Sequence, residues 1–98
     1  MTRAEALERL RAYEADLRAM GVERLALFGS TARGDQRGDS DVDIAATLTT
    51  ERSVGAFHLI RIEQRLADML GVRVDLVTEP SDAPRLQSEI DRDRVDVF

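Results

Sequence analysis

The chain has 98 residues, of which 43% are hydrophobic and 34% are charged, and its formal net charge is −5. This length leaves no room for a second hydrophobic core, so residues 1–98 are predicted to form one globular domain. The acidic balance argues against a protein that coats long nucleic acid, because such proteins usually carry a basic surface.

The side-chain inventory excludes several kinds of site. The chain has no cysteine and no lysine, and its one histidine is His58. A disulfide scaffold, a thiolate zinc site, a cysteine nucleophile and a catalytic lysine are therefore excluded. No apolar run is long enough to span a bilayer and no signal peptide opens the chain, so we expect a cytoplasmic protein with no membrane partner.

The first predicted elements are a helix and a strand. Thr2 and Glu5 have the spacing of a capping box, and the leucines that follow share one helical face up to a stop at Gly21. Residues 25–28 are continuously apolar, which predicts a strand that is covered on both faces.

A polar loop over residues 35–40 leads into a second predicted strand, 41–48, in which polar and apolar residues alternate. The connection between these two strands is too short for a crossover helix, so we expect them to be antiparallel. A helical stripe then runs from Leu59 to Leu70 and closes at Gly71.

The last part of the chain predicts a third strand at 72–77, a turn at 80–84 and a short helix around Leu86 and Ile90. Residues 95–98 are a candidate edge strand. This order predicts an α/β (α+β) fold with one small mixed sheet of three or four strands packed against helices.

Three aspartates are the first candidate site residues. Asp41 and Asp43 are two residues apart on the predicted second strand, so their side chains share a face. Two like charges at this spacing repel one another unless a cation neutralises them. Asp75 joins them if the third strand pairs beside the second. Carboxylates without histidine or cysteine favour a hard cation, Mg²⁺ or Mn²⁺.

The turn after the first strand is the second candidate feature. Gly29 permits a tight turn that brings backbone N–H groups close to a ligand, Ser30 adds a hydroxyl donor, and a helix that starts here would favour phosphate. A phosphate-binding turn beside a two-metal carboxylate site is typical of nucleotidyl transfer. Two roles fit Arg33: it reaches a phosphate, or it pairs with Asp35 or Asp39 to brace the loop.

These motifs resemble the signature of the minimal nucleotidyltransferases of the DNA polymerase beta superfamily, which is Gly-Ser, about ten residues, then Asp-x-Asp. The chain reads Phe28-Gly29-Ser30, ten residues, and then Asp41-Val42-Asp43-Ile44. The strand of the family's third carboxylate is matched by Val74-Asp75-Leu76-Val77. The resemblance covers essentially the whole chain and implies a DNA polymerase beta-like nucleotidyltransferase fold.

The resemblance also implies roles and partners. Asp41 and Asp43 would bind two Mg²⁺ ions, Asp75 would be a further ligand and the base, and Gly29 and Ser30 would hold the β- and γ-phosphates of ATP. Small members of the family are typically encoded beside a HEPN-domain protein, often a ribonuclease toxin. Some act as antitoxins by transferring AMP from ATP onto a tyrosine of that partner.

Other functions stay open at this point. The domain could neutralise a HEPN partner by binding alone, or it could transfer a nucleotidyl group to a small molecule, although relatives that do so are usually longer. Residues 95–98 could add to a partner's sheet or pair between two copies of the chain, so a homo-oligomer is also open.

Overall fold

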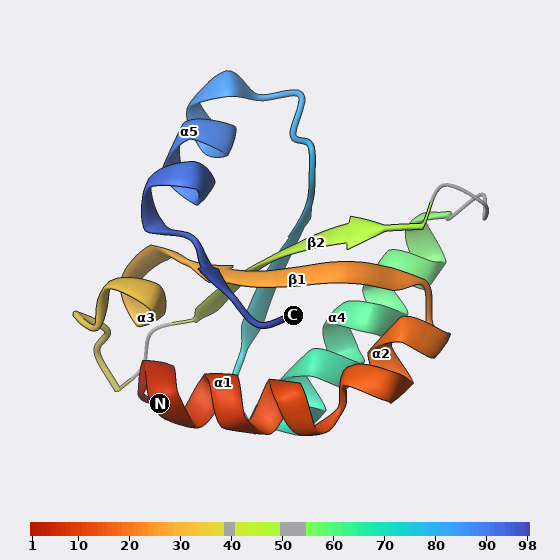
Figure 1. The fold of residues 1–98 in the computed structure, drawn as a ribbon, viewed down its shortest axis with the longest axis horizontal. Helices are drawn as coiled ribbons and strands as arrows, with labels where there is room; N and C mark the ends of the chain where they lie inside the picture. The colour runs from red at the N-terminus through yellow and green to blue at the C-terminus, as the bar shows by residue number, and fades with distance from the viewer. Residues whose placement is uncertain (39–40, 50–54) are drawn as a thin grey trace.

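The computed structural model describes residues 1–38, 41–49 and 55–98 (Figure 1). The predicted elements are found in the predicted order, except that the first helix is divided in two and a short helix lies between the first two strands. In chain order they are α1 (Arg3–Ala12), α2 (Glu14–Ala19), β1 (Val22–Phe28), α3 (Gly29–Arg33), β2 (Val42–Leu48), α4 (Ala56–Leu70), β3 (Val74–Thr78), α5 (Pro84–Asp93) and β4 (Val95–Asp96).

The strands form one mixed sheet in the order β3-β2-β1-β4. β1 pairs antiparallel with β2, as the short connection predicted, and β4 adds antiparallel to the other side of β1. β3 pairs parallel with β2, and α4 makes the crossover between them. The predicted edge strand at the end of the chain is therefore present as β4, and β1 is central.

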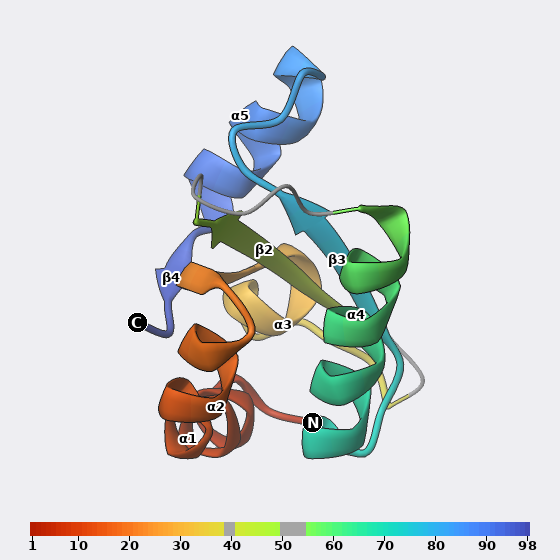
Figure 2. The same cartoon turned by 90° about the vertical axis from the view of Figure 1, so that its right-hand side faces the viewer.

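The two faces of the sheet are covered unequally. Helices α1, α2 and α4 lie on one face and α5 lies on the other (Figures 1 and 2). The larger face holds the main core, which contains Leu10, Leu17, Leu25, Leu27, Val42, Ile44, Ile62, Leu66 and Leu70. On the opposite face a small cluster packs α5 against the sheet through Phe28, Ala45 and Ile90. Much of that second face is thus left for a site.

The first helix begins as predicted but does not continue to Gly21. The Thr2 hydroxyl accepts the Glu5 N–H at 3.1 Å, and the Glu5 carboxylate accepts the Thr2 N–H at 3.4 Å, which completes the capping box. The helix breaks at Tyr13, whose N–H turns to the Leu10 carbonyl at 3.1 Å, and α2 starts one residue later. The predicted single helix is therefore wrong: a bend at Tyr13 divides it into α1 and α2.

Arginines of α1 tie this helix to other elements through backbone carbonyls. Arg3 donates to the Ala32 carbonyl in α3 at 3.0 Å, and Arg9 donates to the Leu70 carbonyl at the end of α4 at 2.8 Å. Arg11 donates to the Asp96 carbonyl in β4 at 3.1 Å and to the Val97 carbonyl just after it at 3.0 Å. A guanidinium offers several N–H donors in a fixed plane, so it suits this use better than an ammonium group.

None of the helices in the described ranges could cross a bilayer, because the longest, α4, has 15 residues and carries charged side chains along its length.

Candidate active site

The candidate site is built on a row of residues that crosses three strands. Phe28 is the register partner of Asp43 in the β1–β2 pair, and Asp43 is the register partner of Asp75 in the β2–β3 pair. Their neighbours Val42 and Ile44 face the main core, so the alternation of a strand places the row on the opposite face. The structure thus brings Asp43 and Asp75 side by side on adjacent strands.

Asp41 has a different setting from the one that strand alternation predicted. β2 begins at Val42, so exposed Asp41 precedes the strand instead of lying in it. Its charge still acts on Asp43. The pKa of Asp43 is raised, first by burial, then by the negative charges of Asp75 and Asp41, while Arg33 opposes the rise. The three carboxylates therefore form one region of repulsion that a cation would relieve.

The donor chemistry of this region fits a magnesium–nucleotide complex. Over the part of the chain that the structure describes, no three acidic or histidine side chains are grouped tightly enough to hold a metal by themselves. Mg²⁺ is ordinarily held by one or two carboxylates, with phosphate oxygens and water completing its shell. Asp43 and Asp75 supply two such carboxylates, with Asp41 beside them, so the residues fit an ion that arrives with its nucleotide.

The turn after β1 is packed directly against this pair. Gly29 has a φ of +72°, and a Cβ at this position would lie 2.2 Å from Asp43 Oδ2. Only glycine combines this backbone conformation with room for the carboxylate. Ser30 follows in the first turn of α3, where its carbonyl accepts the N–H groups of Gly34 and Asp35 at 2.9 and 3.1 Å. A helix of five residues does start at this turn, which is the condition under which the sequence favoured phosphate binding here.

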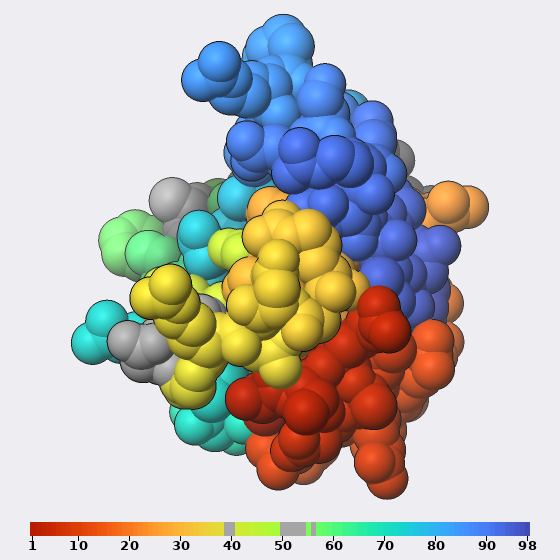
Figure 3. All heavy atoms as spheres, turned by 90° about the vertical axis from the view of Figure 1, so that its left-hand side faces the viewer, coloured from red at the N-terminus to blue at the C-terminus, as the bar shows by residue number. Residues whose placement is uncertain are grey.

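A cavity of about 380 Å³ connects the turn, the aspartate row and α5. Figure 3 views this side of the molecule, where α3 (yellow) lies between α1 (red) and α5 (blue). The residues that line the cavity are Phe28, Gly29, Arg33, Asp43, Asp75, Val77, Leu86, Glu89, Arg92 and Asp93. Four predicted site residues thus share one cavity, whereas Ser30 and Asp41 lie outside its lining.

Arg33 is held at the wall of this cavity by ion pairs. Its Nη1 donates to Asp93 Oδ2 at 2.7 Å, and its Nε donates to Asp35 Oδ2 at 3.1 Å. Asp93, whose side chain is only 4% exposed, also accepts from Arg92 Nε at 3.1 Å. Hydrogen bonds from Arg92 and Arg33 hold the pKa of Asp93 below its usual value. The predicted brace to Asp35 is formed, and the alternative partner Asp39 lies outside the described residues.

The contribution of α5 to the site could not be predicted from the sequence. Asp93 is 60 residues from Arg33 along the chain, and no local spacing connects them. A run of charges near the end of an amphipathic helix gave no signal that the helix faces the site. His58, by contrast, behaves as a structural residue, because its Nε2 lies 2.7 Å from the Met20 carbonyl, away from the lining of the cavity.

Comparison with known proteins identifies the family of this chain. A family described as the nucleotidyltransferase domain matches residues 5–97 of the chain. The chain belongs to the nucleotidyltransferase domain family. It is therefore a nucleotidyltransferase with the mixed sheet of a minimal member of that family.

Two proteins are similar to this chain in sequence, and a third is similar in fold. Protein adenylyltransferase MntA of Thermococcus cleftensis is 40% identical over 73 residues, which are 74% of this chain and 72% of that protein. The solved structure of a candidate minimal nucleotidyltransferase is 36% identical, with a TM-score of 0.75 over 97% of this chain and 95% of the other. The complex of tri-AMPylated Shewanella oneidensis HEPN toxin with MNT antitoxin contains a similarly folded chain, with a TM-score of 0.61 at 20% identity, covering 89% of this chain and 70% of the other.

Proposed function

We propose that this nucleotidyltransferase is a Mg²⁺-dependent protein adenylyltransferase that transfers AMP from ATP to a tyrosine hydroxyl of a HEPN-type toxin. Through this modification it would act as an antitoxin in the cytoplasm. The observation that carries the proposal is the register pair Asp43–Asp75 beside the Gly29 turn in one cavity. The similarity to MntA supports protein as the acceptor class.

The carboxylates divide the work in this proposal. Asp43 and Asp75, with Asp41, would hold two Mg²⁺ ions, for which Mn²⁺ could substitute, and the ions would neutralise charge on the triphosphate. Asp75 is exposed at the mouth of the site and takes the proton of the attacking hydroxyl. The hydroxyl oxygen bonds to the α-phosphorus, the bond from that phosphorus to the bridging oxygen breaks, and pyrophosphate leaves.

The phosphate side of the site belongs to the turn and to Arg33. We assign Gly29 and Ser30 to the β- and γ-phosphates, because the turn is packed on the metal-binding carboxylate Asp43. Arg33 has five N–H donors, and its ion pairs with Asp35 and Asp93 engage only two of its nitrogens. The guanidinium can therefore bind a phosphate oxygen while these pairs hold it in place.

The decisive experiment supplies α-labelled ATP, Mg²⁺ and the product of the gene adjacent to that of this chain, tested as the HEPN-type acceptor. The wild type should label that protein, and Asp43→Asn and Asp75→Asn should each reduce the rate by at least about 100-fold, because each removes a charge from the metal-binding set. Labelling by both variants at the wild-type rate would show that these carboxylates are not the catalytic ones. Growth rescue by Asp43→Asn as complete as by the wild type would favour neutralisation by binding alone.

A further inference from the structure

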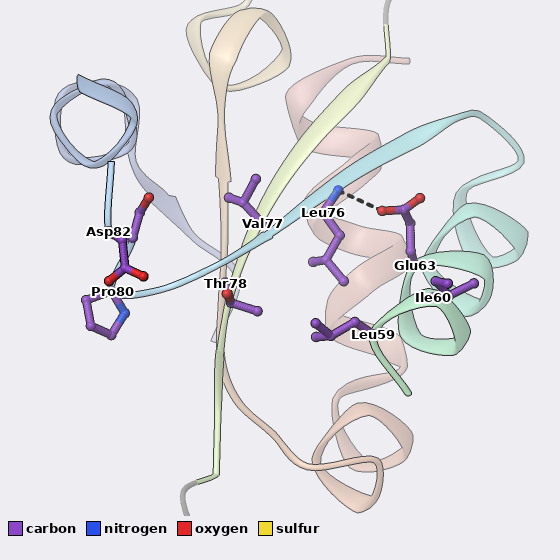
Figure 4. A pocket seen from close by; sticks show the side chains of 9 residues that line it. Leu59, Ile60, Glu63, Leu76, Val77, Thr78, Pro80 and Asp82 are labelled. Carbon is purple, nitrogen blue, oxygen red and sulfur yellow. Dashed lines mark hydrogen bonds between the residues drawn. The ribbon is translucent and has the colours of Figure 1, made fainter. Parts of the chain in front are cut away.

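A second groove lies on the other side of β3 from the catalytic cavity. It has a volume of about 360 Å³ and is lined by Leu59, Ile60, Glu63, Leu76, Val77, Thr78, Pro80, Ser81 and Asp82. Figure 4 shows Leu59 of α4 facing Leu76 and Thr78 of β3, with the segment around Pro80 closing the far end. The groove thus has an apolar floor between a helix and an edge strand.

Two large apolar residues of α4 are exposed near this groove. Ile60 lines the groove and is 53% exposed, and Phe57, three residues earlier on the same helix and outside the groove lining, is 85% exposed. Among the described residues, the remaining large apolar side chain with comparable exposure is Tyr13, on the bend between α1 and α2. An exposed apolar residue in a groove, with a second one next to it on the same helix, is typical of a surface that binds another protein.

The groove adjoins the catalytic cavity through one strand. Val77 lines both the groove and the cavity, and Asp75 lies two residues before it on the same face of β3. A molecule seated in the groove would therefore lie against the outer edge of the strand that carries the proposed base. It would need to reach only across β3 to bring a hydroxyl to Asp75.

The polar groups of the groove restrict what can bind there. Glu63 Oε2 accepts the outward-facing Leu76 N–H at 3.3 Å, so an added strand would have to displace this side chain from the edge of β3. The two charged residues in the lining, Glu63 and Asp82, are both acidic. A phosphate-bearing ligand is disfavoured by their charge, whereas a Lys or Arg beside an apolar side chain is favoured.

We propose that this groove, together with Phe57 and Ile60, docks the acceptor protein of the transfer reaction. The occupant is a helix or loop of that protein that inserts an apolar side chain toward Leu59 and Leu76 and places a basic residue near Asp82. Docking there brings the acceptor hydroxyl over β3 to Asp75. The inference rests on the proposed function and adds to it the surface that recognises the acceptor.

The test separates docking from chemistry by measuring both in the same variants. Phe57→Ser with Ile60→Ser removes the exposed apolar groups, and Asp82→Arg reverses the rim charge; all three positions are exposed or half-exposed, so the fold should persist. Tyr13→Ser is the matched control, because it removes an exposed aromatic side chain away from the groove. Binding of the acceptor protein from the labelling assay, binding of Mg²⁺–AMP-PNP and the labelling rate are measured for each variant.

The proposal predicts that the double variant and Asp82→Arg weaken acceptor binding and raise the KM for acceptor at least about tenfold, with AMP-PNP affinity unchanged. Tyr13→Ser should behave as the wild type. Unchanged acceptor binding in the double variant would overturn the proposal, as would a wild-type dimer that this variant dissociates. Failure of the proposed function would look different, because the wild type would bind the HEPN protein without labelling it.

Discussion

The Asp43 carboxylate is packed directly against Gly29 and leaves no room for a side chain on that residue. The chain turns at Gly29 with a φ of +72°, and a Cβ there would meet Asp43 Oδ2 at 2.2 Å. The turn that follows β1 and the carboxylate that comes from β2 are therefore packed as one unit. Gly29, which we assign to phosphate binding, must therefore also leave room for the proposed metal ligand Asp43.

We expect Gly29→Ala to lower the transfer rate at least about 100-fold, because the methyl group must push the Asp43 carboxylate out of place. The positive φ adds about 1 kcal/mol of backbone strain. Labelling assays at saturating ATP and acceptor would measure the rate, and urea unfolding would measure the strain.

Gly34→Ala is the matched control for this prediction. Gly34 also has a positive φ, +83°, but no atom lies within 4 Å of a Cβ built there. The control should show a similar loss of stability and keep most of the activity. Equal losses of activity in both variants would mean that backbone strain, not the approach to Asp43, sets the requirement for glycine.

Asp43→Asn should stabilise the metal-free protein at neutral pH. Burial and the charges of Asp75 and Asp41 raise the pKa of Asp43, so its ionised form opposes folding. The folded pKa lies above the unfolded value of about 3.9, and the wild type loses stability as pH rises through that window. The variant's advantage should therefore be present at pH 7 and vanish below about pH 3.9.

Thermal unfolding of both proteins, with and without Mg²⁺–AMP-PNP, would measure this effect. The nucleotide complex should stabilise the wild type by about 2.7 kcal/mol at 100 times its Kd and the variant by much less, so that the order of stability reverses. A variant that is less stable than the wild type without ligand at pH 7 would contradict the assignment.

Asp93→Asn should show the opposite dependence on pH. The hydrogen bonds from Arg92 and Arg33 lower the pKa of Asp93, so its carboxylate stabilises the fold above the unfolded value of about 3.9. The wild type should unfold at a higher urea concentration than the variant at pH 7. This difference should shrink as pH falls from about 3.9 through the lowered pKa. A difference that stays constant down to pH 2 would assign it to packing instead of charge.

How much of this arrangement the sequence predicts depends on how local each feature is. The capping box at Thr2, the stop at Gly71 and the alternation around Asp43 are local patterns, and the structure contains each of them. β1 begins at Val22, before the apolar run at residues 25–28 from which the strand was predicted. A register shift next to Val22 leaves Glu23 and Arg24 both exposed, so the first residues of the strand do not alternate. Such an irregularity interrupts the pattern from which a strand is recognised.

Contacts between residues that are far apart in the sequence could be predicted only where a single assumption about strand pairing was enough. Pairing of β2 with β3 is enough to bring Asp75 to Asp43, and this pairing is the condition under which the sequence predicts that the third carboxylate joins the others. The contact between Arg33 and Asp93 needs the position of α5 on the sheet as well, and α5 carries three acidic residues, so the sequence offers no unique partner for Arg33. The sequence therefore predicts the carboxylates better than the wall of the cavity around them.

Ile90 anchors α5 to the sheet, and its truncation should change the site as well as the fold. The side chain of Ile90 is fully buried against Phe28 and Ala45, in the small cluster beneath the cavity. Ile90→Ala should cost about 2–5 kcal/mol, because it leaves a void in a cluster with few other contacts. A loosened α5 releases Asp93 and with it Arg33, so the affinity for Mg²⁺–AMP-PNP should fall.

Ile62→Ala separates this effect from general destabilisation. Ile62 is equally buried, but it lies on α4 in the main core on the other face of the sheet. The control should lose a similar free energy of unfolding and keep its nucleotide affinity at temperatures where both variants remain folded. Equal loss of nucleotide affinity in the two variants would mean that α5 acts only through global stability. Loss of nucleotide affinity in Ile90→Ala alone would show that α5 supports the phosphate side of the cavity.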